Sequence, residues 1–114
     1  MKIVKGKIKV KKLKKMAEKM HGDLVKAIVD VEKEIMAVDA SLHADLFEFL
    51  IKEENSEPKN LWGINFHPSK ENSDFIEFDS MMNVRPSLGN KTRSVENEEL
   101  RNKIVKIANN LVEK

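Results

Sequence analysis

Hydrophobic and polar residues alternate along residues 61–67 and again along residues 76–85. Successive side chains of a β-strand point to opposite faces, so each segment is predicted to form a strand with one apolar and one polar face. The apolar face comprises Trp62, Ile64, Phe66, Ile76, Phe78, Met82 and Val84. The polar face comprises Gly63, Asn65, His67, Glu77, Asp79, Asn83 and Arg85. The segment at 68–73 is expected to join the two strands as a loop.

Apolar residues recur at intervals of three and four near both ends of the chain. Residues 13–20 follow this spacing and Gly22 supplies a stop, which predicts a helix of about three turns that ends near His21. Residues 100–111 carry a single apolar stripe, and Asn97 before them is a good N-cap. The pattern therefore predicts one amphipathic helix at each end.

Three further segments complete the chain. Residues 2–9 alternate loosely between lysines and Ile or Val, which predicts a short edge strand guarded by charge. Residues 24–51 fit both helical spacing and strand alternation, because residues 27–31 are rich in β-branched side chains and residues 39–41 offer a turn. Periodicity alone leaves a hairpin and a helix open for this segment. Residues 52–60 are polar and are expected to form a loop.

These elements predict an α+β fold in a single domain over residues 1–114. A sheet with one apolar face must bury that face, and two amphipathic helices are available to cover it. We therefore expect a mainly antiparallel sheet covered on one face by an N-terminal and a C-terminal helix. The helices should contribute Leu13, Met16, Leu100, Ile104, Ile107 and Leu111 to the shared core.

Composition narrows the class of protein. The chain is 40% hydrophobic and 35% charged, which excludes a fully disordered sequence. It has no cysteine, which excludes disulfides, thiolate zinc sites and cysteine nucleophiles. No apolar run approaches the roughly 20 residues that span a bilayer, and no signal-peptide pattern is present. We expect a soluble, cytoplasmic protein without a membrane partner.

Charge is distributed unevenly along the chain. The net charge is only +2, yet residues 1–19 hold nine lysines against the single acidic residue Glu18. Such a block is typical of nucleic-acid or anionic-membrane binding, and also of a solvated surface. No aromatic residues interleave with these lysines, which disfavours stacking on single-stranded nucleic acid. Weak, non-specific nucleic-acid binding at low salt is therefore the expectation.

The loop after the second predicted strand, residues 85–93, concentrates hydrogen-bond donors. Arg85 can bind a phosphate or carboxylate through two parallel hydrogen bonds, and Gly89 allows a backbone amide to approach a ligand closely. We consider this loop a site for an anionic ligand, with candidate residues Arg85, Ser87, Gly89, Asn90, Lys91 and Arg93. The alternative is that Arg85 pairs with Asp79 or Glu77 and the loop merely leads into the last helix.

The polar face of the predicted strands is a second candidate site. Its candidate residues are Asn65, His67, Asp79 and Asn83, with His43 added from the segment Leu42–Asp45. Imidazoles and carboxylates can bind a metal or transfer protons. The three histidines lack metal-binding spacing, so neither a metal nor a cofactor is predicted. A solvated face of an antiparallel sheet would show the same pattern.

The segments at 25–38, 42–45, 61–65 and above all 76–90, IEFDSMMNVRPSLGN, resemble a family of small prokaryotic proteins, the domain of unknown function five-six-seven-four. The resemblance implies an α+β domain that runs helix, antiparallel sheet, helix, and it implies no established reaction, cofactor or catalytic residue. Relatives tend to have two glycines in place of Asp39-Ala40, and a glycine near Asn55. The resemblance therefore implies turns at these places and favours a hairpin over residues 25–51.

Two classes of function remain for this chain. A binding or regulatory module would use the loop at 85–93 to hold an anionic ligand or a protein partner. A small enzyme would need His43, His67, Asp79 and Arg85 to converge in one cleft. We favour the binding module, and the geometry of these four side chains distinguishes the two classes.

Overall fold

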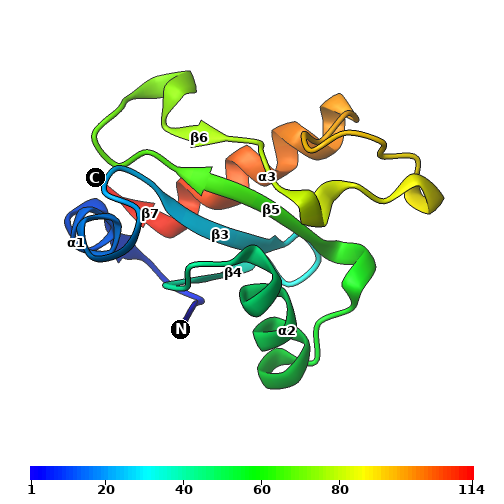
Figure 1. The fold of residues 1–114 in the computed structure, drawn as a ribbon, viewed down its shortest axis with the longest axis horizontal. Coiled ribbons are helices and arrows are strands. Elements are labelled where there is room, and N and C mark those ends of the chain that lie inside the picture. The colour runs from blue at the N-terminus through cyan, green and yellow to red at the C-terminus, as the bar shows by residue number, and fades with distance from the viewer.

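The computed structural model describes residues 1–114 and shows an α+β fold built on a five-stranded antiparallel sheet (Figure 1). The strand order across this sheet is β1 (Lys2–Val4), β4 (Ile35–Val38), β3 (Val25–Asp30), β5 (Leu61–Phe66) and β6 (Ile76–Glu77). A separate parallel ladder joins β2 (Ile8–Lys9) to β7 (Val112–Glu113). The predicted fold class is confirmed.

Helices α1 (Val10–Met20) and α3 (Glu98–Leu111) cover the same face of the sheet, as predicted. The register pairs Ala27 with Ile64 and Val29 with Trp62, so these side chains share that face. They form a core of 20 buried residues together with the apolar sides of both helices, and α3 crosses behind the sheet in Figure 1. Burial of this face is the main source of stabilisation, since apolar area removed from water contributes roughly 25 cal/mol per Å².

Helix α2 (His43–Glu54) covers part of the opposite face, which the sequence did not predict to be covered. Its Leu46 and Leu50 pack on Ile28 and Leu61 in a second, smaller core. The helix contacts β3 and β4. The sheet is therefore buried on both faces along β3 and β4.

Residues 25–51 combine both of the predicted alternatives. A hairpin of β3 and β4 turns at residues 31–34, and helix α2 follows after residue 42. The hairpin expected over the whole segment is thus correct only to Val38. Asp39 connects β4 to α2 with a φ of +76°, and Asn55 ends α2 with a φ of +54°. Glycine adopts this left-handed conformation without strain, which fits the glycines that the resemblance implies near these positions.

The second predicted strand is shorter than expected, because β6 ends at Glu77 and Met81–Asn83 forms a 3-10 turn. The Ser80 hydroxyl accepts a hydrogen bond from the Met82 N–H, which turns the chain out of the strand. Met82 consequently packs on the second core under α2, and the prediction that it joins the first core is wrong. Val84 joins neither core, whereas Phe78 is partly buried against the first one.

The remaining boundaries shift by a few residues. A bend at residues 5–6 divides the predicted strand at 2–9 into β1 and β2. Helix α2 extends to Glu54, so the polar loop begins three residues later than predicted. The N-cap prediction is confirmed, because the Asn97 side chain accepts a hydrogen bond from the Leu100 N–H. None of the helices combines the length and the apolar character needed to cross a membrane.

Candidate functional site

The side chain of Asn83 forms the hydrogen bonds that a neighbouring strand would form with Gly63 of β5. Strand β6 pairs with β5 only at Asn65 and Phe66, so Gly63 has no strand partner on that side. The Asn83 amide fills this position, because its Oδ1 accepts from the Gly63 N–H at 2.8 Å and its Nδ2 donates to the Gly63 carbonyl at 2.9 Å. Asn83 is fully buried. This candidate residue therefore completes the sheet and does not face a ligand.

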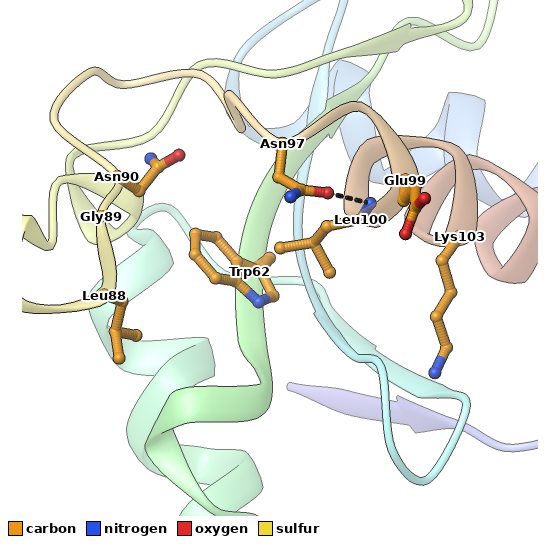
Figure 2. Close-up of a pocket in the computed structure, with 8 residues that line it drawn as sticks. All are labelled: Trp62, Leu88, Gly89, Asn90, Asn97, Glu99, Leu100 and Lys103. Atoms are coloured by element: carbon orange, nitrogen blue, oxygen red, sulfur yellow. Dashed lines mark hydrogen bonds between the residues drawn. The ribbon is translucent and has the colours of Figure 1, made fainter.

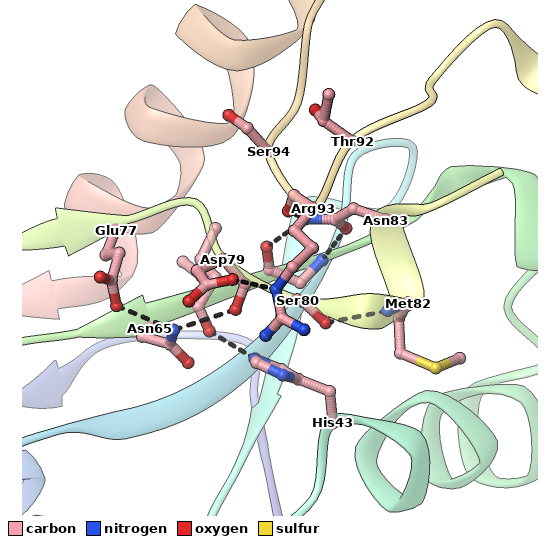
Figure 3. A network of polar contacts seen from close by, with 12 residues as sticks. His43, Asn65, Glu77, Asp79, Ser80, Met82, Asn83, Thr92, Arg93 and Ser94 are labelled. Carbon is pink, nitrogen blue, oxygen red and sulfur yellow. Dashed lines mark hydrogen bonds and ion pairs between the residues drawn. The ribbon is translucent and has the colours of Figure 1, made fainter. Parts of the chain in front are cut away.

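The segment around Ser80 lies directly against Gly63. A Cβ atom at Gly63 would lie 2.6 Å from both Cβ and Oγ of Ser80, so the close approach requires glycine. The Ser80 N–H donates to the Arg93 carbonyl at 3.1 Å, and the Asn83 Nδ2 donates to the same carbonyl at 3.0 Å. The backbone of Arg93 is thereby fixed beside the turn that follows β6 (Figure 3).

The side chain of Arg93 points from this fixed backbone toward the ring of His43 (Figure 3). Its Nε donates to Asp79 Oδ1, and its two terminal nitrogens form no hydrogen bond within the chain. The side chain is 52% exposed. Arg93 therefore keeps a positive group with free donors at the surface, held in place by a carboxylate.

His43 is the first residue of α2 and is buried to 7% exposure. Its Nε2 donates to the Ile64 carbonyl over 2.8 Å, which leaves Nδ1 as the acceptor of a neutral ring. Burial lowers the pKa of His43 from its usual 6.5; the Ile64 carbonyl and Asp79 oppose this shift, while Lys26 and Arg93 add to it. Nδ1 forms no hydrogen bond within the chain and is not sealed from solvent.

These residues border a hollow of about 210 Å³ at the start of α2. The hollow is lined by Lys26, Leu42, His43, Ala44, Ser80, Met81, Met82 and Arg93. Leu42 is the N-cap of α2 and supplies no side-chain hydrogen bond, so the first N–H groups of the helix lack a capping side chain. The partial positive charge of a helix N-terminus favours anions. We call this cavity the α2 hollow.

Arg85 does not reach the α2 hollow. Its Nη1 donates to the Pro58 carbonyl at 2.7 Å, and its Nη2 donates to the Leu61 carbonyl. The guanidinium carbon lies 4.0 Å from the ring centroid of Trp62. Burial lowers the pKa of Arg85. The predicted pairing of Arg85 with Asp79 or Glu77 is therefore wrong, because its guanidinium donates to two backbone carbonyls and stacks on an aromatic ring. Ligand binding by Arg85 stays a prediction.

Most of the loop at 85–93 is occupied with its own hydrogen bonds. Asn90, 4% exposed, donates through Nδ2 to the carbonyls of Asn83 and Ser94, at 2.7 Å in each case, and accepts at Oδ1 from the Glu96 N–H. The Lys91 N–H donates to the Glu96 carboxylate. The candidates Ser87 and Gly89 are exposed, and Gly89 ends a 3-10 turn at a φ of +80°. Among the six loop candidates, Arg93 is the one that lines the α2 hollow.

A larger hollow of about 620 Å³ lies between this loop and the start of α3 (Figure 2). Trp62 lies at its centre but is only 5% exposed, so it offers an edge and no open ring face for stacking. The Asn97 Oδ1 on its rim is engaged with the Leu100 N–H. Glu99 and Lys103 both line this hollow, and their charges are opposite. This hollow offers less free polar chemistry than the α2 hollow.

The four residues of the enzyme alternative do not line one cleft. His67 Nε2 lies 3.1 Å from Glu77 Oε1, which also accepts from Asn65 Nδ2 at 3.0 Å. Asp79 is bound to Arg93, and Arg85 lies on Trp62, so His43 alone of the four lines the α2 hollow. No three His, Asp or Glu side chains gather closely enough to hold a metal ion.

The sequence prediction missed most of the wall of the α2 hollow. Lys26, Leu42 and Ala44 were overlooked because the helix beginning at His43 had not been separated from the hairpin before it. Met81 and Met82 were overlooked because they were assigned to a continuous strand. The available signal was Leu42, an apolar residue that follows Ser41 directly and precedes the helical segment, since Leu is a poor N-cap.

Comparison with known proteins gives a family and no function. None of the curated proteins compared with the chain matches it, and none of the solved structures does. The model of one family matches residues 2–111, and that family is described as "Protein of unknown function (DUF5674)". The match covers nearly the whole chain. The protein therefore belongs to the DUF5674 family, as its sequence resemblance indicated.

Proposed function

We propose that this protein is a cytoplasmic binding module that holds a small anionic ligand in the α2 hollow. The observation that carries the proposal is the convergence of three positive features: the free guanidinium nitrogens of Arg93, the side chain of Lys26 and the uncapped start of α2. The proposal keeps the anionic ligand predicted from the sequence, and it keeps Arg93 and His43. It moves the site away from Arg85.

A buried hydroxyl group supports a ligand at this place. Ser80 is 1% exposed, and its hydroxyl accepts from the Met82 N–H but donates to no acceptor in the chain. Buried polar groups are usually paired, because leaving one unpaired costs free energy. A ligand oxygen in the α2 hollow would supply an acceptor for the Ser80 hydroxyl.

The helix start contributes to the same preference. The N-cap position of α2 is usually Ser, Thr, Asp or Asn, whose side chain accepts from the first N–H groups of the helix. Leu42 cannot do so. An anion bound in the α2 hollow would take over this capping role, with a favourable interaction with the helix dipole of about 0.3–1 kcal/mol.

Anion binding is tested by thermal unfolding and titration calorimetry with sulfate, phosphate and acetate on three proteins. Arg93→Gln removes the proposed ligand contact, and Lys91→Gln removes the same charge from an exposed side chain of the same loop outside the α2 hollow. We expect an anion to stabilise the parent protein and Lys91→Gln alike. Arg93→Gln should lose about tenfold in affinity or more, since a charge-assisted hydrogen bond contributes roughly 1.5–3 kcal/mol.

Two outcomes contradict the proposal. Either none of the three anions stabilises the parent protein, or Arg93→Gln and Lys91→Gln weaken binding equally. The second outcome would mean that the anion responds to the overall charge of the loop and not to the α2 hollow.

A further inference from the structure

The rim of the α2 hollow is apolar, and this property limits the chemical class of ligand that the site can hold. We infer, on the basis of the proposed anion site, that the ligand is a monocarboxylate that carries a short apolar group. The carboxylate would lie against Arg93, Lys26 and the start of α2. The apolar group would lie against Leu42, Met81 and Met82.

The apolar rim is unusual for this molecule. Five large hydrophobic side chains of the chain are exposed, and two of them, Leu42 at 57% and Met81 at 63%, border the same 210 Å³ hollow. Single exposed apolar residues are ordinary, whereas a cluster beside polar groups is typical of a binding site. Methionine is flexible and adapts to the shape of an apolar ligand. The lining thus offers apolar surface next to fixed positive charge.

The charges around the hollow match a single negative charge. Lys26 and Arg93 line the hollow and are positive, and Asp79, the ion-pair partner of Arg93, is negative. Their sum is one positive charge, so a monoanion would neutralise the site. A phosphate dianion would leave one negative charge in excess, in a partly desolvated place where unpaired charge is costly. The planar guanidinium of Arg93 also matches the geometry of a carboxylate.

The volume limits the ligand to a small group. At about 210 Å³ the hollow is below the roughly 300–1,000 Å³ that is typical of sites for drug-sized ligands. It would take a carboxylate with a short chain, or the last residue of a longer one. A free short-chain acid and the C-terminal residue of a peptide share this chemistry, and the experiment separates them.

The experiment measures the affinity of the parent protein for acetate, butanoate and hexanoate by titration calorimetry, with hexanamide as the uncharged control. We expect affinity to rise about fourfold for each added methylene, the equivalent of roughly 0.8 kcal/mol per buried CH₂, until the hollow is full. Hexanamide should bind at least tenfold more weakly than hexanoate.

Variants locate the apolar contacts. Met81→Gln should flatten the dependence on chain length while acetate binding stays within about twofold of the parent value. Leu88→Gln is the matched control, because Leu88 is a 49% exposed apolar residue outside the α2 hollow. It should leave the series unchanged. Thermal unfolding without ligand establishes that each variant is folded.

A peptide arm distinguishes the two sources of carboxylate. A tetrapeptide ending in leucine is compared with its C-terminal amide and with hexanoate. Tighter binding of the free-carboxylate peptide than of hexanoate assigns a peptide C-terminus, and equal or weaker binding assigns a free acid.

The inference is overturned if acetate, phosphate and hexanoate bind equally well in the α2 hollow, and the proposed anion site then stands without its apolar component. If no anion of any kind binds, the proposed function and this inference both fail.

Discussion

Asn83 forms hydrogen bonds with both backbone polar groups of Gly63, at 2.8 and 2.9 Å, and so pairs with β5 as a strand would. Replacing it with leucine would leave two buried backbone groups unsatisfied, each at a cost of about 1–3 kcal/mol. We expect Asn83→Leu to lower the free energy of unfolding by about 2–5 kcal/mol in urea titrations. Asn102→Ala, on an exposed position of α3, is the control and should change stability by less than about 0.5–1 kcal/mol. A similarly small effect of Asn83→Leu would contradict the pairing role.

Arg85 should behave as a structural residue. Arg85→Lys keeps the charge but loses the planar fork that reaches the Pro58 and Leu61 carbonyls and stacks on Trp62. We expect a loss of about 1–3 kcal/mol in unfolding free energy, with anion affinity unchanged. If Arg85→Lys lost anion binding but kept the stability of the parent protein, Arg85 would be a ligand-binding residue and the anion site would include it.

Leu42→Ser should raise stability and lower anion affinity together. The serine hydroxyl would accept from the first N–H groups of α2 and stabilise the helix by about 0.5–2 kcal/mol. It would also occupy the groups that the proposed anion uses. Thermal unfolding with and without acetate measures both effects. Unchanged acetate stabilisation in a variant of increased stability would show that the helix start is not part of the site.

The stability of the protein should depend on pH through His43. Its pKa is lowered from 6.5 by burial, so the folded chain binds the proton less tightly than the unfolded chain does. The stability that neutral His43 contributes is therefore complete above the unfolded pKa of 6.5, and it is lost as the pH falls toward the folded-state pKa.

The measurement is urea unfolding of the parent protein and two variants from about pH 7 to about pH 5. His43→Gln keeps a donor for the Ile64 carbonyl and should show a shallower loss of stability on acidification than the parent protein. His21→Gln, at an exposed position, should follow the parent curve. An identical pH dependence of the parent and His43→Gln would contradict the assignment.

The lysines of α1 allow a test of nucleic-acid binding. All five lysines of this helix are exposed, and none of them forms an ion pair within the chain. We expect weak, non-specific binding to duplex DNA at low salt that disappears near physiological ionic strength. Six phosphate contacts, drawn from the nine lysines of residues 1–19, would give a slope of log affinity against log salt of about −5. Tight binding in fluorescence anisotropy at physiological salt would favour nucleic acid as the principal partner.

Local patterns predicted the elements that depend on local physics. Helices α1 and α3 and strand β5 have a regular hydrophobic period, and α3 also has Asn97 as its N-cap. Their shared core followed from the need to bury one face of the sheet. Strand β6 was overextended because the Ser80 hydroxyl turns the chain, and hydrophobic alternation carries no information about that hydrogen bond. Helix α2 was one of two open alternatives, because residues 24–51 satisfy the periods of a helix and of a strand at once.

The candidate site was harder to predict, for a physical reason. Arg85, Asn83 and Asn90 are the residue types that bind anions, and the same donors also fasten backbone carbonyls inside a fold. The sequence does not distinguish these two uses. Arg93 reaches the α2 hollow only because its backbone is fixed beside Ser80, a contact between segments that lie apart in the chain.

The parallel ladder of β2 and β7 pairs Ile8 with Val112 and so joins segments near the two ends of the described chain. A contact between residues so far apart in sequence requires the closure of a long loop, whose entropy must be lost before the contact contributes any stability. The ladder has only two residue pairs, so its hydrogen bonds contribute too little free energy to offset this loss of entropy early in folding. We therefore expect this ladder to form late in folding, after the apolar sides of α1 and α3 have met on the sheet, so that it joins two helices that are already packed.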